Sequence, residues 1–122
     1  MDEEKKPLID SNLLQGWNKH LQECLHELDK ADVVLDEHDP NLLRIHIITE
    51  GRSGYTFDFT AQYVDDREIK VEFVDVERVN QAVDEHTDRI QSLTEDYVRH
   101  IHECAQILQR VTHAKATGSN NN

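Results

Sequence analysis

The sequence LLRIHIITEGRSGYTFDFTAQYV, residues 42–64, consists of two alternating runs separated by a turn with two glycines, Gly51 and Gly54. A period of two places successive side chains on opposite faces of a strand. In the second run one face carries Tyr55, Phe57, Phe59, Ala61 and Tyr63, and the other carries Thr56, Asp58, Thr60 and Gln62. The stretch therefore predicts an antiparallel hairpin with one buried face and one wet face.

Two further runs extend this hairpin on either side. The four predicted strands are Val33–Leu35, Leu42–Thr49, Tyr55–Val64 and Ile69–Val74. Asp39-Pro40-Asn41 and Asp65-Asp66 supply turn residues between them. The inward positions of the neighbouring runs match those of the third, and they are Leu43, Ile45 and Ile47, with Ile69, Val71 and Phe73. We expect a four-stranded antiparallel meander whose register is fixed, because a slip of one residue would expose every apolar side chain.

A helix is predicted before the meander. Asp10 or Ser11 can cap its N-terminus, and the helix should end near Lys30 or Ala31. Its apolar positions recur at three- and four-residue intervals, and they are Leu13, Leu14, Trp17, Leu21, Cys24, Leu25 and Leu28. The helix should therefore bury one face against the sheet.

A second helix is predicted after the meander, over residues 76–112, where the chain has neither Gly nor Pro. One stripe joins Val79, Val83, His86, Ile90, Leu93, Tyr97, Ile101, Cys104, Leu108 and Val111. As one helix this segment would be about 55 Å long, and part of it would overhang and pair with a second copy. The alternative is a break near Ser92-Leu93-Thr94, with Thr94 capping a new helix. We favour the continuous helix.

These elements predict a two-layer α+β fold: an N-terminal helix, a four-stranded antiparallel meander and a long C-terminal helix, with both helices on one face of the sheet. A chain of 122 residues has room for one domain. We assign residues 1–9 to a flexible lead-in, 10–113 to the domain and 114–122 to a disordered tail.

The two predicted helices carry nearly the same twelve residues. Trp17–Leu28 and Tyr97–Leu108 share an aromatic residue, a base, His, an aliphatic residue, Glu, Cys and Leu at the same offsets. Each of the chain's two cysteines thus follows a histidine by four residues, a spacing that places both side chains on one helical face. The repeat is either a metal site shared by two helices or a packing motif used twice.

A metal site would consist of His20, Cys24, His100 and Cys104, the His₂Cys₂ set that zinc prefers. Two observations oppose it. Cys104 lies in the apolar stripe, where a free thiol usually packs as a small hydrophobe. In an antiparallel arrangement the predicted helix ends also leave His20 and His100 about 20 Å out of register. We therefore favour a packing motif without a cofactor, and keep zinc binding as the alternative.

The same stripe suggests a homodimer interface. Because the predicted helix is longer than a small domain needs, we expect His86, Tyr97, Ile101 and Leu108 to face a second copy.

Composition narrows the function classes. The net charge of −12 disfavours nucleic acid and anionic membranes and favours a basic protein surface as the partner. No apolar run approaches the roughly 20 residues that span a bilayer, and no secretory signal precedes the domain, so we expect a cytoplasmic protein. Phosphate loops, dinucleotide fingerprints and nucleophile elbows are absent from the sequence. We expect a small acidic binding or regulatory module, such as an adaptor, an inhibitor or a chaperone-like protein, without enzymatic activity.

Overall fold

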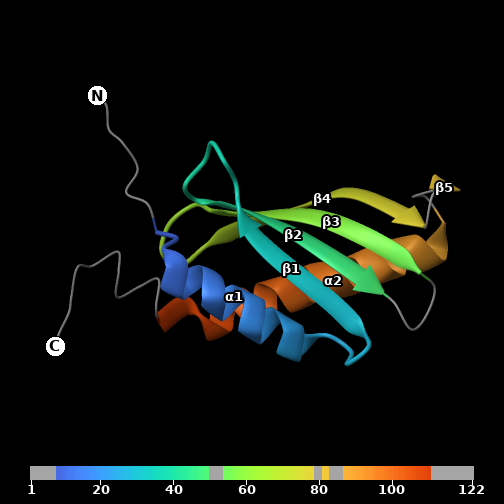
Figure 1. Cartoon of the computed structure of the whole chain (residues 1–122), viewed down its shortest axis with the longest axis horizontal. Helices are drawn as coiled ribbons and strands as arrows, with labels where there is room; N and C mark the ends of the chain where they lie inside the picture. The colour runs from blue at the N-terminus through green and yellow to red at the C-terminus, as the bar shows by residue number, and fades with distance from the viewer. Residues whose placement is uncertain (1–7, 50–53, 79–80, 83–86, 111–122) are drawn as a thin grey trace, which may run out of the picture.

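The computed structural model describes residues 8–49, 54–78, 81–82 and 87–110. Its elements are α1 (Ser11–Cys24), β1 (Asp29–Leu35), β2 (Leu42–Thr49), β3 (Tyr55–Tyr63), β4 (Ile69–Arg78), β5 (Gln81–Ala82) and α2 (Asp88–Ile107). The strands form one antiparallel sheet in the order β1-β2-β3-β4-β5. Both helices lie on the same side of this sheet (Figure 1). The predicted α+β architecture is confirmed, with β5 as a short addition.

The core lies between the helices and the inner face of the sheet. The alternating residues of β3 behave as expected, since Phe57, Phe59, Ala61 and Tyr63 are buried. Trp17 of α1 is fully buried, and its indole N–H donates to the Tyr63 hydroxyl at 3.0 Å. Tyr97 of α2 packs on Phe57, with ring centroids 5.1 Å apart. Aromatic residues from three elements thus join the two layers.

The buried region begins before residue 10. Leu8 and Ile9 are buried, and the Leu8 N–H donates to Asn41 Oδ1 at 2.8 Å. These two residues, which we assigned to a flexible lead-in, belong to the core. The predicted tail, 114–122, lies outside the described residues.

The first helix ends earlier than predicted. It stops at Cys24, Leu25 takes up an extended conformation, and the next strand begins at Asp29. Leu28, assigned to the helical stripe, is 56% exposed. The helical periodicity was misleading at Leu28, because only its position in the sequence fits the stripe. From Asp29 onward the chain instead pairs with β2 as a strand.

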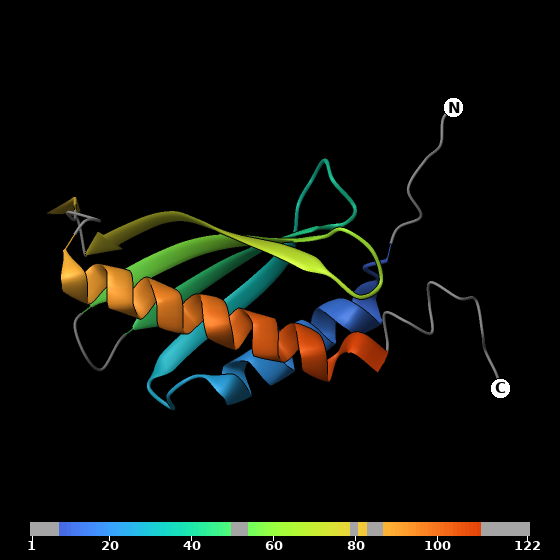
Figure 2. The ribbon, with the colours of Figure 1, turned by 180° about the vertical axis from the view of Figure 1, so that it is seen from behind.

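The helix predicted over residues 76–112 is also corrected. Residues 76–78 belong to β4, and α2 begins at Asp88, where Thr87 Oγ1 accepts from the Ile90 N–H. The alternative break is absent, because Ser92, Leu93 and Thr94 all lie inside α2. At 20 residues α2 is about 30 Å long, and within the described residues it crosses the domain without the predicted overhang (Figure 2). The start of the helix was predicted too early because residues 76–87 contain neither Gly nor Pro and because Val79, Val83 and His86 continue the helical stripe.

Side chains of α1 cover the outer edge of β1. The Asn18 side chain accepts from the Val33 N–H and donates to the Val33 carbonyl, each at 2.9 Å. One helical turn later, the Gln22 side chain accepts from the Ala31 N–H and donates to the Asp29 carbonyl. The two amides thus take the place of a neighbouring strand. None of the helices in the described part of the chain is long and apolar enough to cross a membrane.

Candidate functional site

The two copies of the repeated motif face one another across the contact between α1 and α2. Gly16 lies against Leu108, where an added Cβ would come within 2.9 Å of Leu108 Cδ2. The Cys104 thiol lies 3.9 Å from the Trp17 carbonyl oxygen. Our estimate of a 20 Å register offset was based on wrong helix ends, since α1 stops at Cys24 and α2 begins at Asp88. The motif therefore marks where the helices pack on each other.

The histidines of the motif form matching local contacts instead of converging. His20 Nδ1 lies 3.1 Å from Glu23 Oε1, and His100 Nδ1 lies 3.0 Å from Glu103 Oε1. Within the described ranges, no group of three or more His, Cys, Asp or Glu side chains is arranged to hold a metal ion. The geometry of His20, Cys24, His100 and Cys104 thus gives no support to the zinc alternative.

The two thiols lie in surroundings that oppose ionisation. Burial raises the pKa of Cys104, and electrostatic interactions with Cys24 and Glu23 raise it further. Burial also raises the pKa of Cys24, with smaller contributions from the carboxylates of Glu103 and Glu23. A nucleophilic cysteine needs the opposite shift. Both thiols are therefore suited to packing and not to nucleophilic attack.

The predicted interface residues lie in the interior of the chain. Tyr97, Ile101 and Leu108 are at most 5% exposed, and the Tyr97 hydroxyl donates to Asp29 Oδ2 at 3.1 Å. His86 lies outside the described residues. The three described residues pack within this chain, so they offer little surface to a second copy.

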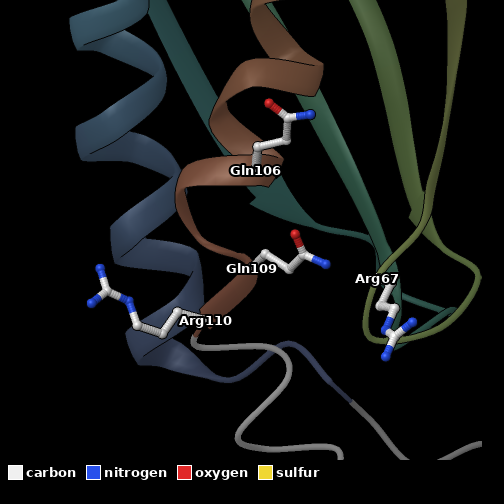
Figure 3. Close-up of a pocket in the computed structure, with 4 residues that line it drawn as sticks. All are labelled: Arg67, Gln106, Gln109 and Arg110. Atoms are coloured by element: carbon white, nitrogen blue, oxygen red, sulfur yellow. The ribbon is translucent and has the colours of Figure 1, made fainter.

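One cavity, of about 500 Å³, lies between the C-terminal end of α2 and the turn that joins β3 to β4 (Figure 3). It is lined by Arg67, Gln106, Gln109 and Arg110. Small-molecule pockets are mostly apolar, whereas all four of these side chains are polar or charged. Figure 3 shows the two guanidinium groups pointing away from each other, so they do not converge on one ligand. This cavity lacks the features of a built binding site.

A second depression, of about 230 Å³, lies on the face of the sheet opposite the helices. Residues from β1, β2, β3 and β4 line it: Asp32, Val34, Arg44, Ile45, His46, Asp58, Phe59, Thr60 and Val74. Val34 and Val74 are 45% and 54% exposed. We call the outward side chains around this depression the open face. Val34 and Val74 thus place two exposed apolar side chains on the same surface as the carboxylates of Asp32 and Asp58.

A β-bulge places Asp75 on the open face beside Val74. The pairing of β3 with β4 shifts between Asp58 and Phe59, where Asp58 is opposite Asp75 and Phe59 is opposite Phe73. Val74 is the extra residue of β4, and it points outward together with Asp75. Without the bulge, strict alternation from Phe73 would leave Val74 outward but turn Asp75 toward the helices. The bulge thus adds an acidic side chain to the open face.

The charges of the open face follow the strand register. Asp32, His46, Asp58 and Asp75 form one row across four strands. His46 Nδ1 lies 2.6 Å from Asp58 Oδ1. In the next row Arg44 donates to Asp36 at 2.8 Å. The His38 N–H lowers the pKa of Asp36 most, and the bonds from Arg44 and the Asp39 N–H lower it further. Asp32 and Asp75 have no cationic partner among the described residues, so the row keeps an acidic excess.

The open face was not predicted from the sequence as a site. Asp58 and Thr60 were assigned correctly to the wet side of β3, but Asp32 was omitted because the first strand was predicted to begin at Val33. The bulge was missed because the fourth strand was predicted to end at Val74, although two consecutive apolar residues, Phe73 and Val74, break the alternation there. Comparison of the chain with protein-family models, curated proteins and solved structures gives no match.

Proposed function

We propose that this protein is a non-enzymatic, cytoplasmic binding module that receives a basic segment of a partner protein on the open face of its sheet. The observation that carries the proposal is the depression between Val34 and Val74, with Asp32 and Asp58 on its walls. Its volume of about 230 Å³ is smaller than the roughly 300–1,000 Å³ of typical small-molecule pockets. A side chain from a partner protein fits a depression of that size better.

Charge supports a basic partner. The chain carries a net charge of −12, and Asp32 and Asp75 on the open face have no described cationic partner. The two basic side chains that line the depression, Arg44 and His46, each already contact a carboxylate. An approaching lysine or arginine would therefore meet carboxylates that have no described cationic partner, with Val34 and Val74 on either side of the depression.

A binding role also agrees with the state of the thiols. Raised pKa values at Cys24 and Cys104 keep both sulfurs protonated at neutral pH. The helical layer thus serves to hold the sheet in place, while the sheet presents the contact surface.

The test begins with affinity capture from the native cell and mass spectrometry, followed by titration calorimetry with the purified partner. Val34→Lys/Val74→Lys should weaken binding at least about tenfold, because it removes the apolar contact and places two positive charges against a basic partner. Val64→Lys is the matched control, since Val64 is 52% exposed but does not line the depression. Equal affinities for the wild type and the double variant would contradict the proposal.

A further inference from the structure

The two outer edges of the sheet differ in how far their backbone groups are hydrogen-bonded. Along β1, Asn18 and Gln22 bond to backbone groups of Asp29, Ala31 and Val33. Along β4, β5 pairs only with Glu77 and Arg78. The remaining length of β4 has no neighbouring strand on that side within the described ranges, as the outermost position of β4 in Figure 2 also shows.

The hydrogen-bonding pattern identifies the unpaired groups. The Val64 N–H donates to the Glu68 carbonyl at 2.9 Å, at the end of the β3–β4 pair. Bonding alternates along an antiparallel pair, so Lys70 and Glu72 direct their backbone groups toward β3. Ile69, Val71 and Phe73 direct theirs outward. No hydrogen bond from another described residue reaches these three, and such an edge is a template for another strand.

We propose that a second copy of this chain pairs with this edge of β4, antiparallel and centred on Val71. In this register Val71 is opposite Val71 of the second copy, and Ile69 is opposite Phe73. Lys70 is then directly opposite Glu72 of the second copy, and the two-fold axis repeats this pair. In the single chain the two side chains contact each other, with Lys70 Nζ 3.4 Å from Glu72 Oε2. Pairing exchanges these two contacts, one within each copy, for two between the copies.

The charges select this register over its neighbours. Moving the centre to Lys70 places Lys70 opposite itself and Glu72 opposite Glu68. Moving it to Glu72 places Glu72 opposite itself. Like charges directly opposite each other destabilise a strand pair, whereas opposite charges stabilise it. Only the register centred on Val71 is self-complementary among these three.

The apolar side of the edge is also incompletely covered. Ile69, Val71 and Phe73 are partly buried and point toward the helical layer, where Val98 and Ala105 of α2 are partly buried as well. A second β4 would cover these side chains further, and both helical layers would lie on one side of a continuous sheet. The two open faces would then form one surface. The pairing itself does not depend on the binding role proposed above.

Sedimentation velocity from micromolar to millimolar concentration tests the proposal with the full chain. The wild type should dimerise. Lys70→Glu and Glu72→Lys should each raise the dimer dissociation constant about tenfold or more, because like charges then face each other twice. The double variant Lys70→Glu/Glu72→Lys restores opposite charges and should dimerise as the wild type does.

Lys30→Glu is the control, since Lys30 is an exposed lysine on the far strand β1 and its reversal should leave the dissociation constant unchanged. Thermal unfolding of each variant would verify the fold, since Lys70 and Glu72 are both more than half exposed. A wild type that stays monomeric, as expected if the edge accepts a strand of another protein, would overturn the proposal. So would a dimer that Lys70→Glu leaves intact, or a double variant that fails to recover.

Discussion

Single side chains decide how firmly the two layers are joined, and the Trp17–Tyr63 pair is the clearest case. Trp17 and Tyr63 are 0% and 3% exposed, and the Tyr63 hydroxyl oxygen accepts the hydrogen bond of the indole N–H. Tyr63→Phe leaves the buried indole N–H without an acceptor. We expect a loss of roughly 1–3 kcal/mol in the free energy of unfolding, measured by urea denaturation.

The same residue predicts how stability depends on alkaline pH. Burial raises the pKa of Tyr63 from 10.0 to about 12. Below pH 10 the hydroxyl is protonated in both the folded and the unfolded chain. Between pH 10 and 12 only the unfolded chain releases the proton, so folding should lose roughly 2–3 kcal/mol over this range. Tyr63→Phe should show a shallower decline, and identical slopes for the two proteins would contradict the assignment.

The cysteines give a second prediction at this scale. Because burial raises the pKa of Cys104 and its side chain is 0% exposed, iodoacetamide should alkylate it slowly in the folded protein at neutral pH. In denaturant, Cys24 and Cys104 should react at similar rates. Peptide mass spectrometry separates the two sites. Rapid alkylation of Cys104 in the folded protein would point to an accessible, activated thiol instead.

At the scale of elements, the side-chain amides of Asn18 and Gln22 in α1 supply the hydrogen bonds that a neighbouring strand would give to β1. Asn18→Ala removes both bonds to Val33, and Gln22→Ala removes those to Asp29 and Ala31. Each should cost about 1–3 kcal/mol in urea denaturation, since paired backbone groups lose their partners. Gln15→Ala, on the exposed side of the same helix, should change stability by less than about 0.5 kcal/mol. Equal effects at the three positions would mean that the amides do not protect β1.

The crossing of α1 and α2 depends on Gly16. Replacing Gly by Ala inside a helix normally stabilises it by up to about 1 kcal/mol. Here the new Cβ would lie 2.9 Å from Leu108 Cδ2, so Gly16→Ala should give no gain in the wild type. In a Leu108→Ala background the gain should appear. Urea denaturation of the four proteins measures this coupling, and the same effect in both backgrounds would argue against close packing at this point.

The ends of the helices and strands show which features can be predicted from the sequence and which cannot. The alternation from Tyr55 to Tyr63 predicted both the strand and its buried face, because a period of two admits one interpretation there. The end of α1 was missed because Leu28 fits the helical stripe, and the start of α2 was missed because residues 76–87 lack Gly and Pro and continue the stripe through Val79, Val83 and His86. These boundaries are determined by hydrogen bonds to residues distant in sequence, and the periodicity of a segment carries no information about such bonds.

At the scale of the whole molecule, the layers set which surface is free. Both helices cover one face, and the repeated motif packs in the contact between them. The open face holds two exposed valines and two acids that have no cationic partner among the described residues. The sequence could predict the covered face. It could not predict the candidate site, because that site depends on the register of four strands and on a bulge. The net charge and the length of the chain follow directly from the sequence, but the location of the acidic side chains on the folded surface does not.

The most direct test of the binding proposal is a titration of the captured partner into protein with labelled valine and isoleucine methyl groups, followed by NMR. The methyl signals of Val34 and Val74 should shift or broaden at substoichiometric partner, because both side chains line the depression. Those of Val64 and Ile107, similarly exposed but elsewhere, should stay unchanged. Perturbation confined to Ile107 and the helical layer, with Val34 and Val74 unaffected, would contradict a binding role for the open face.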